Sequence, residues 1–189
     1  MDLQAVVVEF NAAVESQRES LDDAACEVNL TEVERLLQLP MNPDVRDEKF
    51  RNWAITPLMQ ASARRQADVV QLLLEAGADK EFCDTMGITP LFAAADKGHA
   101  PVVRLLLEAG ARKEVQDING RMALIAASMN GHTAVVQLLL EAGAEKDARD
   151  SEGHTALMEA SRNGHASVGQ LLLDAGAERP NGRSACILS

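Results

Sequence analysis

The sequence contains few aromatic residues and few cysteines. Aromatic residues make up 3% of the 189 residues, with one Trp and no Tyr, so a core must be built from Leu, Val, Ala and Met. The three cysteines, Cys26, Cys83 and Cys186, have no close spacing, which excludes a CxxC redox or zinc motif and favours a reducing compartment. No apolar run approaches the roughly 20 residues that a membrane-spanning helix needs.

Basic charge is also scarce. The chain has 18 Lys and Arg against 29 Asp and Glu, for a net charge of −11. A nucleic-acid partner is not expected, because phosphate binding requires a basic patch. Acidic residues concentrate in residues 1–50, where 12 Asp or Glu face 4 Lys or Arg. Two interpretations remain open: attraction of a basic partner protein, or solubility alone.

Catalytic and metal-binding signatures are weak. The sequence shows no nucleophile with a paired base, no glycine-rich phosphate loop and no close carboxylate pair. His99, His132 and His165 recur at one equivalent position, but packed helices stand about 10 Å apart, which is too far for shared metal ligation. We therefore expect no enzyme, no metal and no cofactor, and we expect each of these histidines to brace a turn.

One string is repeated four times. Leu-Leu-Leu-(Glu/Asp)-Ala-Gly-Ala begins at Leu72, Leu105, Leu138 and Leu171, each 33 residues after the last. A fixed period of this length predicts a solenoid, in which each unit buries its apolar face against its neighbours.

Each unit predicts a helix, a tight turn, a second helix and a loop. A capping Thr followed by Pro, as in Thr89-Pro90, is a good helix start. A glycine such as Gly110 then suits the left-handed residue after a helix. Turn-forming Asp and Gly, as in residues 84–87, separate one unit from the next.

The combination of Thr89-Pro90-Leu91, Gly98-His99, Val102-Val103 and the segment from Leu105 to Ala111 resembles the ankyrin repeat. The resemblance covers residues from about 51 to 177 and implies an all-α solenoid of helix-turn-helix units with projecting β-turn loops. One departure concerns the residue after the Leu, commonly His in that family. Here it is apolar in every unit: Met59, Phe92, Ile125 and Met158.

The expected organisation has four parts. They are an N-terminal amphipathic helix (1–18), a diverged capping repeat (19–50), four repeats in 51–179 (51–83, 84–116, 117–149 and 150–179), and a flexible tail (180–189). The apolar stripe of the first part fits a helix folded over the end of the stack or a docking helix for a partner. In the last repeat, Gly169 replaces the valine of earlier units, which predicts early fraying.

The resemblance implies a non-catalytic, monomeric protein–protein interaction module, either an adaptor or an inhibitor, that binds through the concave face. Alternatives are an accessory or regulatory subunit of an enzyme complex, or a structural spacer. Trp53 is either an exposed anchor or packed beside Phe50. The candidate partner-binding residues are Trp53, Met86, Asn119, Glu152, Gln60, Arg64, Asp96, Lys97, Met129, Asn130, Arg162 and Asn163.

The last four residues, Cys186-Ile187-Leu188-Ser189, fit the C-a-a-X pattern of farnesylation. The alternatives are an unmodified tail or a tail folded back onto the last repeat. One prenyl chain binds membranes only marginally, so modification at Cys186 predicts weak, reversible membrane association of an otherwise cytoplasmic protein. With Met1-Asp2 at the start and no apolar leader, a cytosolic location is expected.

Overall fold

A computed structural model describes residue 44 and residues 55–179 of the chain. The expectations for residues 1–18, for most of residues 19–50, for Trp53 and for the tail with Cys186 lie outside these residues. The described part holds eight α-helices and no strand. The helices are α3 (Pro57–Ala63), α4 (Ala67–Glu75), α5 (Pro90–Asp96), α6 (Ala100–Glu108), α7 (Ala123–Met129), α8 (Thr133–Glu141), α9 (Ala156–Arg162) and α10 (Ala166–Asp174).

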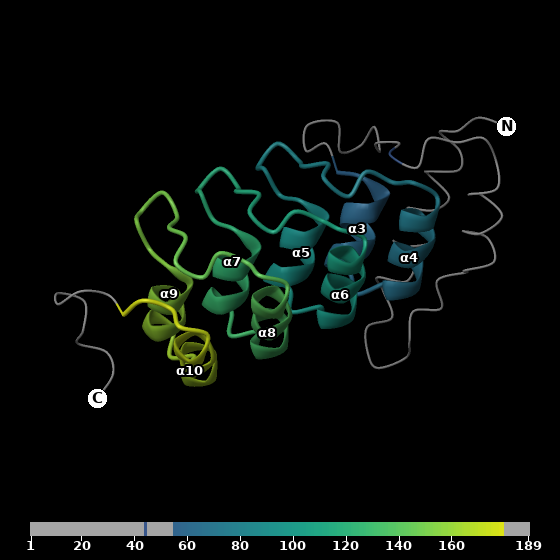
Figure 1. Ribbon diagram of the computed structural model, residues 1–189. Helices are drawn as coiled ribbons and strands as arrows, with labels where there is room; N and C mark the ends of the chain where they lie inside the picture. The colour runs from purple at the N-terminus through teal and green to yellow at the C-terminus, as the bar shows by residue number, and fades with distance from the viewer. Residues whose placement is uncertain (1–43, 45–54, 180–189) are drawn as a thin grey trace, which may run out of the picture.

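The helices form two rows (Figure 1). The inner row is α3, α5, α7 and α9, in which each helix packs against the next, and the outer row is α4, α6, α8 and α10. Each inner helix also packs against the outer helix that follows it in the chain. The long loops project together beside the inner row (Figure 1). The expected all-α solenoid is therefore confirmed.

The inner helices begin as the sequence indicates. The side chains of Thr56, Thr89 and Thr155 each accept a hydrogen bond from the backbone N–H three residues later, which satisfies a donor that a helix start leaves free. Met122 stands at this place before α7 and forms no side-chain cap. Packing takes the place of the side-chain cap at the start of α7, since every residue from Ala123 to Ser128 is buried.

Two of the tight turns within the units, at Gly98 and Gly131, favour glycine for two reasons, whereas Arg65 occupies the equivalent position of the first described unit with a φ of 63°. Gly98 has a φ of 74°, in the left-handed region that favours glycine. A Cβ on Gly98 would also lie 2.6 Å from Nδ1 of His132 in the next unit. The same holds for Gly131, where a Cβ would lie 2.5 Å from Nδ1 of His165. Neighbouring units thus approach closely at these turns.

The core runs along the whole stack between the two rows. Fully buried side chains recur at equivalent positions: Leu58 and Leu91; Val69, Val70, Val102, Val103, Val135 and Val136; Leu106, Leu139 and Leu172. Burying each Leu or Val contributes about 1.5–3 kcal/mol, so stability comes from contacts between successive units. No helix in 55–179 has both the length and the apolar character needed to cross a bilayer.

Candidate partner-binding face

The projecting loops are held by aspartates. In each of three successive loops an aspartate Oδ1 accepts hydrogen bonds from two backbone N–H groups, two and four residues later. These residues are Asp84, Asp117 and Asp150. The hydrogen bonds fix the tip of each loop, because a short carboxylate side chain that bonds its own backbone closes a turn.

Neighbouring loop tips are joined by the main chain. The Ile118 N–H donates to the Met86 carbonyl at 2.9 Å, and the Ser151 N–H donates to the Asn119 carbonyl at the same distance. The glycines of these turns allow this approach: a Cβ on Gly120 would lie 2.7 Å from Oγ of Ser151. The tips therefore form one continuous edge.

Two apolar side chains are exposed on this edge. Met86 is 37% exposed and Ile118 is 60% exposed, and they are the exposed large apolar residues of the described part. Asn119 and Glu152 on the following tips are exposed as well. Sequence reasoning singled out Met86, Asn119 and Glu152 but missed Ile118. The sequence does contain a signal for Ile118: it is a large apolar residue, whereas the equivalent positions of the neighbouring units hold the small polar residues Thr85 and Ser151.

The inner helices carry the other candidate residues, all at their C-terminal ends except Gln60, which lies in the middle of α3. The exposed ones are Arg64, Lys97, Asn130, Arg162 and Asn163; Gln60, Asp96 and Met129 are half-buried. Two of them are linked across units, since the Asn130 side-chain amide donates to Asp96 Oδ1 at 3.0 Å. Lys97 pairs with the same carboxylate at 3.0 Å. This polar row lies at the C-terminal ends of the inner helices, and the loops lead into their N-terminal ends.

Asp117, in the middle one of the three loops, is a buried anion. Its Oδ2 pairs with Arg121 Nη2 at 2.6 Å, and the Arg121 guanidinium lies over the Phe92 ring, 5.8 Å from the centroid. Burial would raise the pKa of Asp117, but hydrogen bonds from the Arg121 side chain and from the backbone of Arg121 and Asn119 outweigh it. The pKa therefore lies below its usual value.

The repeated histidines tie each unit to the previous one. Nε2 of His99, His132 and His165 lies 3.0–3.1 Å from the carbonyls of Ala63, Asp96 and Met129. The bracing role predicted for these residues extends across the unit boundary, and their ring nitrogens are engaged one by one rather than shared. Burial lowers the pKa of His99, aided by the positive charges of Arg65 and Lys97 and by His132.

A fourth histidine, His154, lies between Asp150 and Glu159, and these three side chains could together hold a metal ion. Sequence reasoning missed this group. The missed signal is again a difference between units: His154 stands where Arg121 and Ile88 stand, and Glu159 where Ala126 and Ala93 stand.

Comparison with known proteins identifies a family. No curated protein matches the chain. A family model described as ankyrin repeats (three copies) matches residues 21–117 and 109–181, which together make up most of the sequence. Ankyrin repeats generally bind other proteins, and their family is typically non-catalytic. With two rows of stacked helices and an edge of loop tips, the chain belongs to the ankyrin repeat family.

Proposed function

We propose that this chain is a non-catalytic adaptor or inhibitor that binds a partner protein across the loop edge and the ends of the inner helices. The observation that supports this is the exposed apolar pair, Met86 and Ile118, on two tips joined by a main-chain hydrogen bond. Exposed apolar side chains that lie together on a polar surface are typical of binding sites. Met adds a flexible side chain that adapts to different partners.

The partner's chemistry follows from what surrounds the pair. A partner would place an apolar side chain against Met86 and Ile118, at the centre of the contact. The chain's net charge of −11 favours a basic partner surface. Asn119 and Glu152 on the following tips would then supply the polar rim, where contacts give orientation more than affinity.

The test compares two double variants of the full chain. Met86→Ser with Ile118→Ser removes the apolar pair, and Gln71→Ala with Gln137→Ala changes exposed residues on the outer helices α4 and α8. Proteins captured from cells after cross-linking are quantified for both variants and for the original chain. We expect a loss of about tenfold or more for the loop variant, since anchor residues contribute over 1 kcal/mol each, and no loss for the outer variant. Equal capture by both variants would contradict the proposal.

Cytoplasmic location and modification of the tail belong to the same proposal. If Ser189 carries the free carboxyl group of the mature chain, Cys186 would accept a farnesyl group and give weak membrane association. Intact-mass measurement of protein from eukaryotic cells, with Cys186→Ser as control, tests this. An unmodified mass would limit the proposal to a freely diffusing, monomeric binding module.

A further inference from the structure

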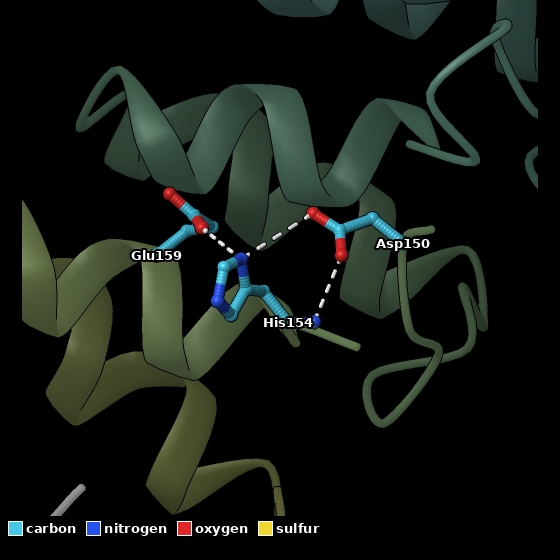
Figure 2. A group of neighbouring side chains, drawn as sticks. All are labelled: Asp150, His154 and Glu159. Carbon is cyan, nitrogen blue, oxygen red and sulfur yellow. Dashed lines mark hydrogen bonds and ion pairs between the residues drawn. The ribbon is translucent and has the colours of Figure 1, made fainter. Parts of the chain in front are cut away.

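Three side chains that favour metal ions meet where the last described loop joins α9 (Figure 2). His154 Nδ1 lies 3.2 Å from Glu159 Oε1 and 3.8 Å from Asp150 Oδ2. All three candidate ligand atoms lie within 4.8 Å of one another. Asp150 and His154 come from the loop, and Glu159 comes from the first turn of α9.

The group is shielded from solvent and incompletely satisfied. The Glu159 side chain is 3% exposed, that of Asp150 is 9% exposed and that of His154 is 31% exposed. Nδ1 of His154 is itself buried, and no described group hydrogen-bonds to it. Three carboxylate oxygens nevertheless lie near it: Oε1 of Glu159 at 3.2 Å, Oε2 of the exposed Glu152 at 3.5 Å and Oδ2 of Asp150 at 3.8 Å. A buried polar nitrogen without a hydrogen bond calls for an explanation such as an ion. A cation at this point would satisfy the nitrogen and offset the charge of these carboxylates.

In Glu159 and in Asp150, one carboxylate oxygen accepts hydrogen bonds from other groups and the second oxygen faces Nδ1 of His154. Glu159 Oε2 accepts from Arg162 Nη2 at 2.8 Å, which leaves Oε1 toward Nδ1. Asp150 Oδ1 accepts the backbone N–H groups of Glu152 at 2.9 Å and His154 at 2.8 Å, which leaves Oδ2 toward the same nitrogen. Hydrogen bonds of this kind orient metal ligands and strengthen binding.

The spacing fits a tetrahedral transition-metal site. Zinc binds His nitrogen and carboxylate oxygen at about 2.0–2.2 Å, which places neighbouring ligand atoms about 3.3–3.5 Å apart. The distances from His154 Nδ1 to the two carboxylate oxygens, 3.2 and 3.8 Å, fall on either side of this value, and the two oxygens lie within 4.8 Å of each other. One imidazole with two carboxylates suits Zn²⁺ better than Mg²⁺ or Ca²⁺, which prefer oxygen ligands alone.

We propose that Asp150, His154 and Glu159 bind one Zn²⁺ ion through Oδ2, Nδ1 and Oε1, with the fourth position open to water. The site is particular to the last described unit, because the preceding units have Arg121 and Ala126, or Ile88 and Ala93, at the places of His154 and Glu159. The ion would tie the loop to α9. Partner binding through Met86 and Ile118 does not depend on it.

The chain itself supplies the test variants. His154→Arg and Glu159→Ala each install the residue that the preceding unit carries at the equivalent position, so both should fold. Untagged full-length protein, freed of metal, is titrated with ZnCl₂ by calorimetry. The original chain should bind one more Zn²⁺ ion than either variant, or should bind it at least about tenfold more tightly. Its melting temperature should rise with Zn²⁺, while that of each variant rises less.

His165→Gln serves as the matched control. Its ring nitrogen is already engaged with the Met129 carbonyl, so this variant should bind Zn²⁺ like the original chain. Equal stoichiometry and affinity for the original chain and for both site variants would overturn the proposal, because the metal would then sit elsewhere. Binding of Mg²⁺ with the same affinity as Zn²⁺ would overturn the assigned metal class. Folding of each variant is checked by circular dichroism, and either variant alone is sufficient for the comparison.

Discussion

At the scale of single residues, the position before the helix-capping residue sets the electrostatics of each loop. Ile88, Arg121 and His154 occupy this position in successive units, while an aspartate four residues earlier is common to all of them. Isoleucine adds no charge, arginine adds a permanent cation, and histidine adds a group that can be protonated or bind a metal. One position therefore gives three chemically different loops on the same backbone.

Replacing Arg121 with the isoleucine of the preceding unit should raise the pKa of Asp117. The folded pKa lies below the usual value, so Asp117 stabilises the fold above its unfolded pKa of about 3.9, and this contribution is lost as the pH falls through the folded pKa. Arg121→Ile should cost about 1–3 kcal/mol at neutral pH. Titration of the Asp117 carboxyl carbon by NMR, with the exposed Arg104→Ala as control, checks it. An unchanged Asp117 titration would show that the backbone hydrogen bonds alone lower the pKa.

His99 should make the fold sensitive to mild acid. Because its folded pKa is lowered, its contribution is fully present above the unfolded pKa of about 6.5 and is lost as the pH falls below that value. Arg65, Lys97 and His132 face the ring, and their positive charges oppose its protonation. In His99→Gln, which installs the residue found at Gln66, the loss of stability on acidification should be smaller. Urea unfolding at a series of pH values measures this, and identical curves for both proteins would contradict it.

At the scale of the helices, much of the fold could be predicted from local chemistry. Thr89 and Gly110 act within a few residues, so the sequence alone indicates where α5 begins and where α6 ends. The first residue of α7 lacks such a cap, and the helix forms because it is buried between α5 and α9. The boundaries proposed for the repeats, the first helix and the tail remain predictions.

The candidate site was less predictable, because it depends on contacts between units. Ile118 lies beside Met86 because its N–H donates to the Met86 carbonyl of the preceding loop. The meeting of His154 with Glu159 depends on how the loop folds back onto α9. Periodicity predicts which positions are equivalent, but not which side chains the loop brings together.

Replacing Gly169 in α10 should stabilise the protein. Its equivalents are Val103 and Val136, and a Cβ built on Gly169 would meet only Leu157 Cδ1, at 3.9 Å, an ordinary contact. Gly169→Ala should add about 0.5–1 kcal/mol from helix propensity. As a matched control, Gly164→Ala should destabilise, since Gly164 has a φ of 75°. Chemical denaturation of both variants measures these changes, and a loss of stability in Gly169→Ala would show hidden strain in α10.

At the scale of the whole molecule, stability should vary along the stack. In a solenoid each unit is stabilised by its neighbours, and stability is approximately the sum of unit and interface contributions. Within the described residues, α6 and α8 each have an outer helix on both sides, whereas α10 packs against α8 and α9 alone. Among the described helices, the last pair therefore has a neighbouring pair on one side only.

Hydrogen exchange should reveal this gradient. Amides of α10 should exchange faster than those of α6 and α8, because local opening costs least where the fewest buried contacts are broken. Gly169→Val should slow exchange in α10, because the valine would pack as in earlier units and would restrict the backbone of the unfolded segment, while exchange in α6 stays unchanged.

If the zinc site holds the loop to α9, adding Zn²⁺ should slow exchange at the start of α9 more than in α10. Uniform exchange across α6, α8 and α10 would instead show that the stack opens as one cooperative body, with the missing valine offset by its neighbours.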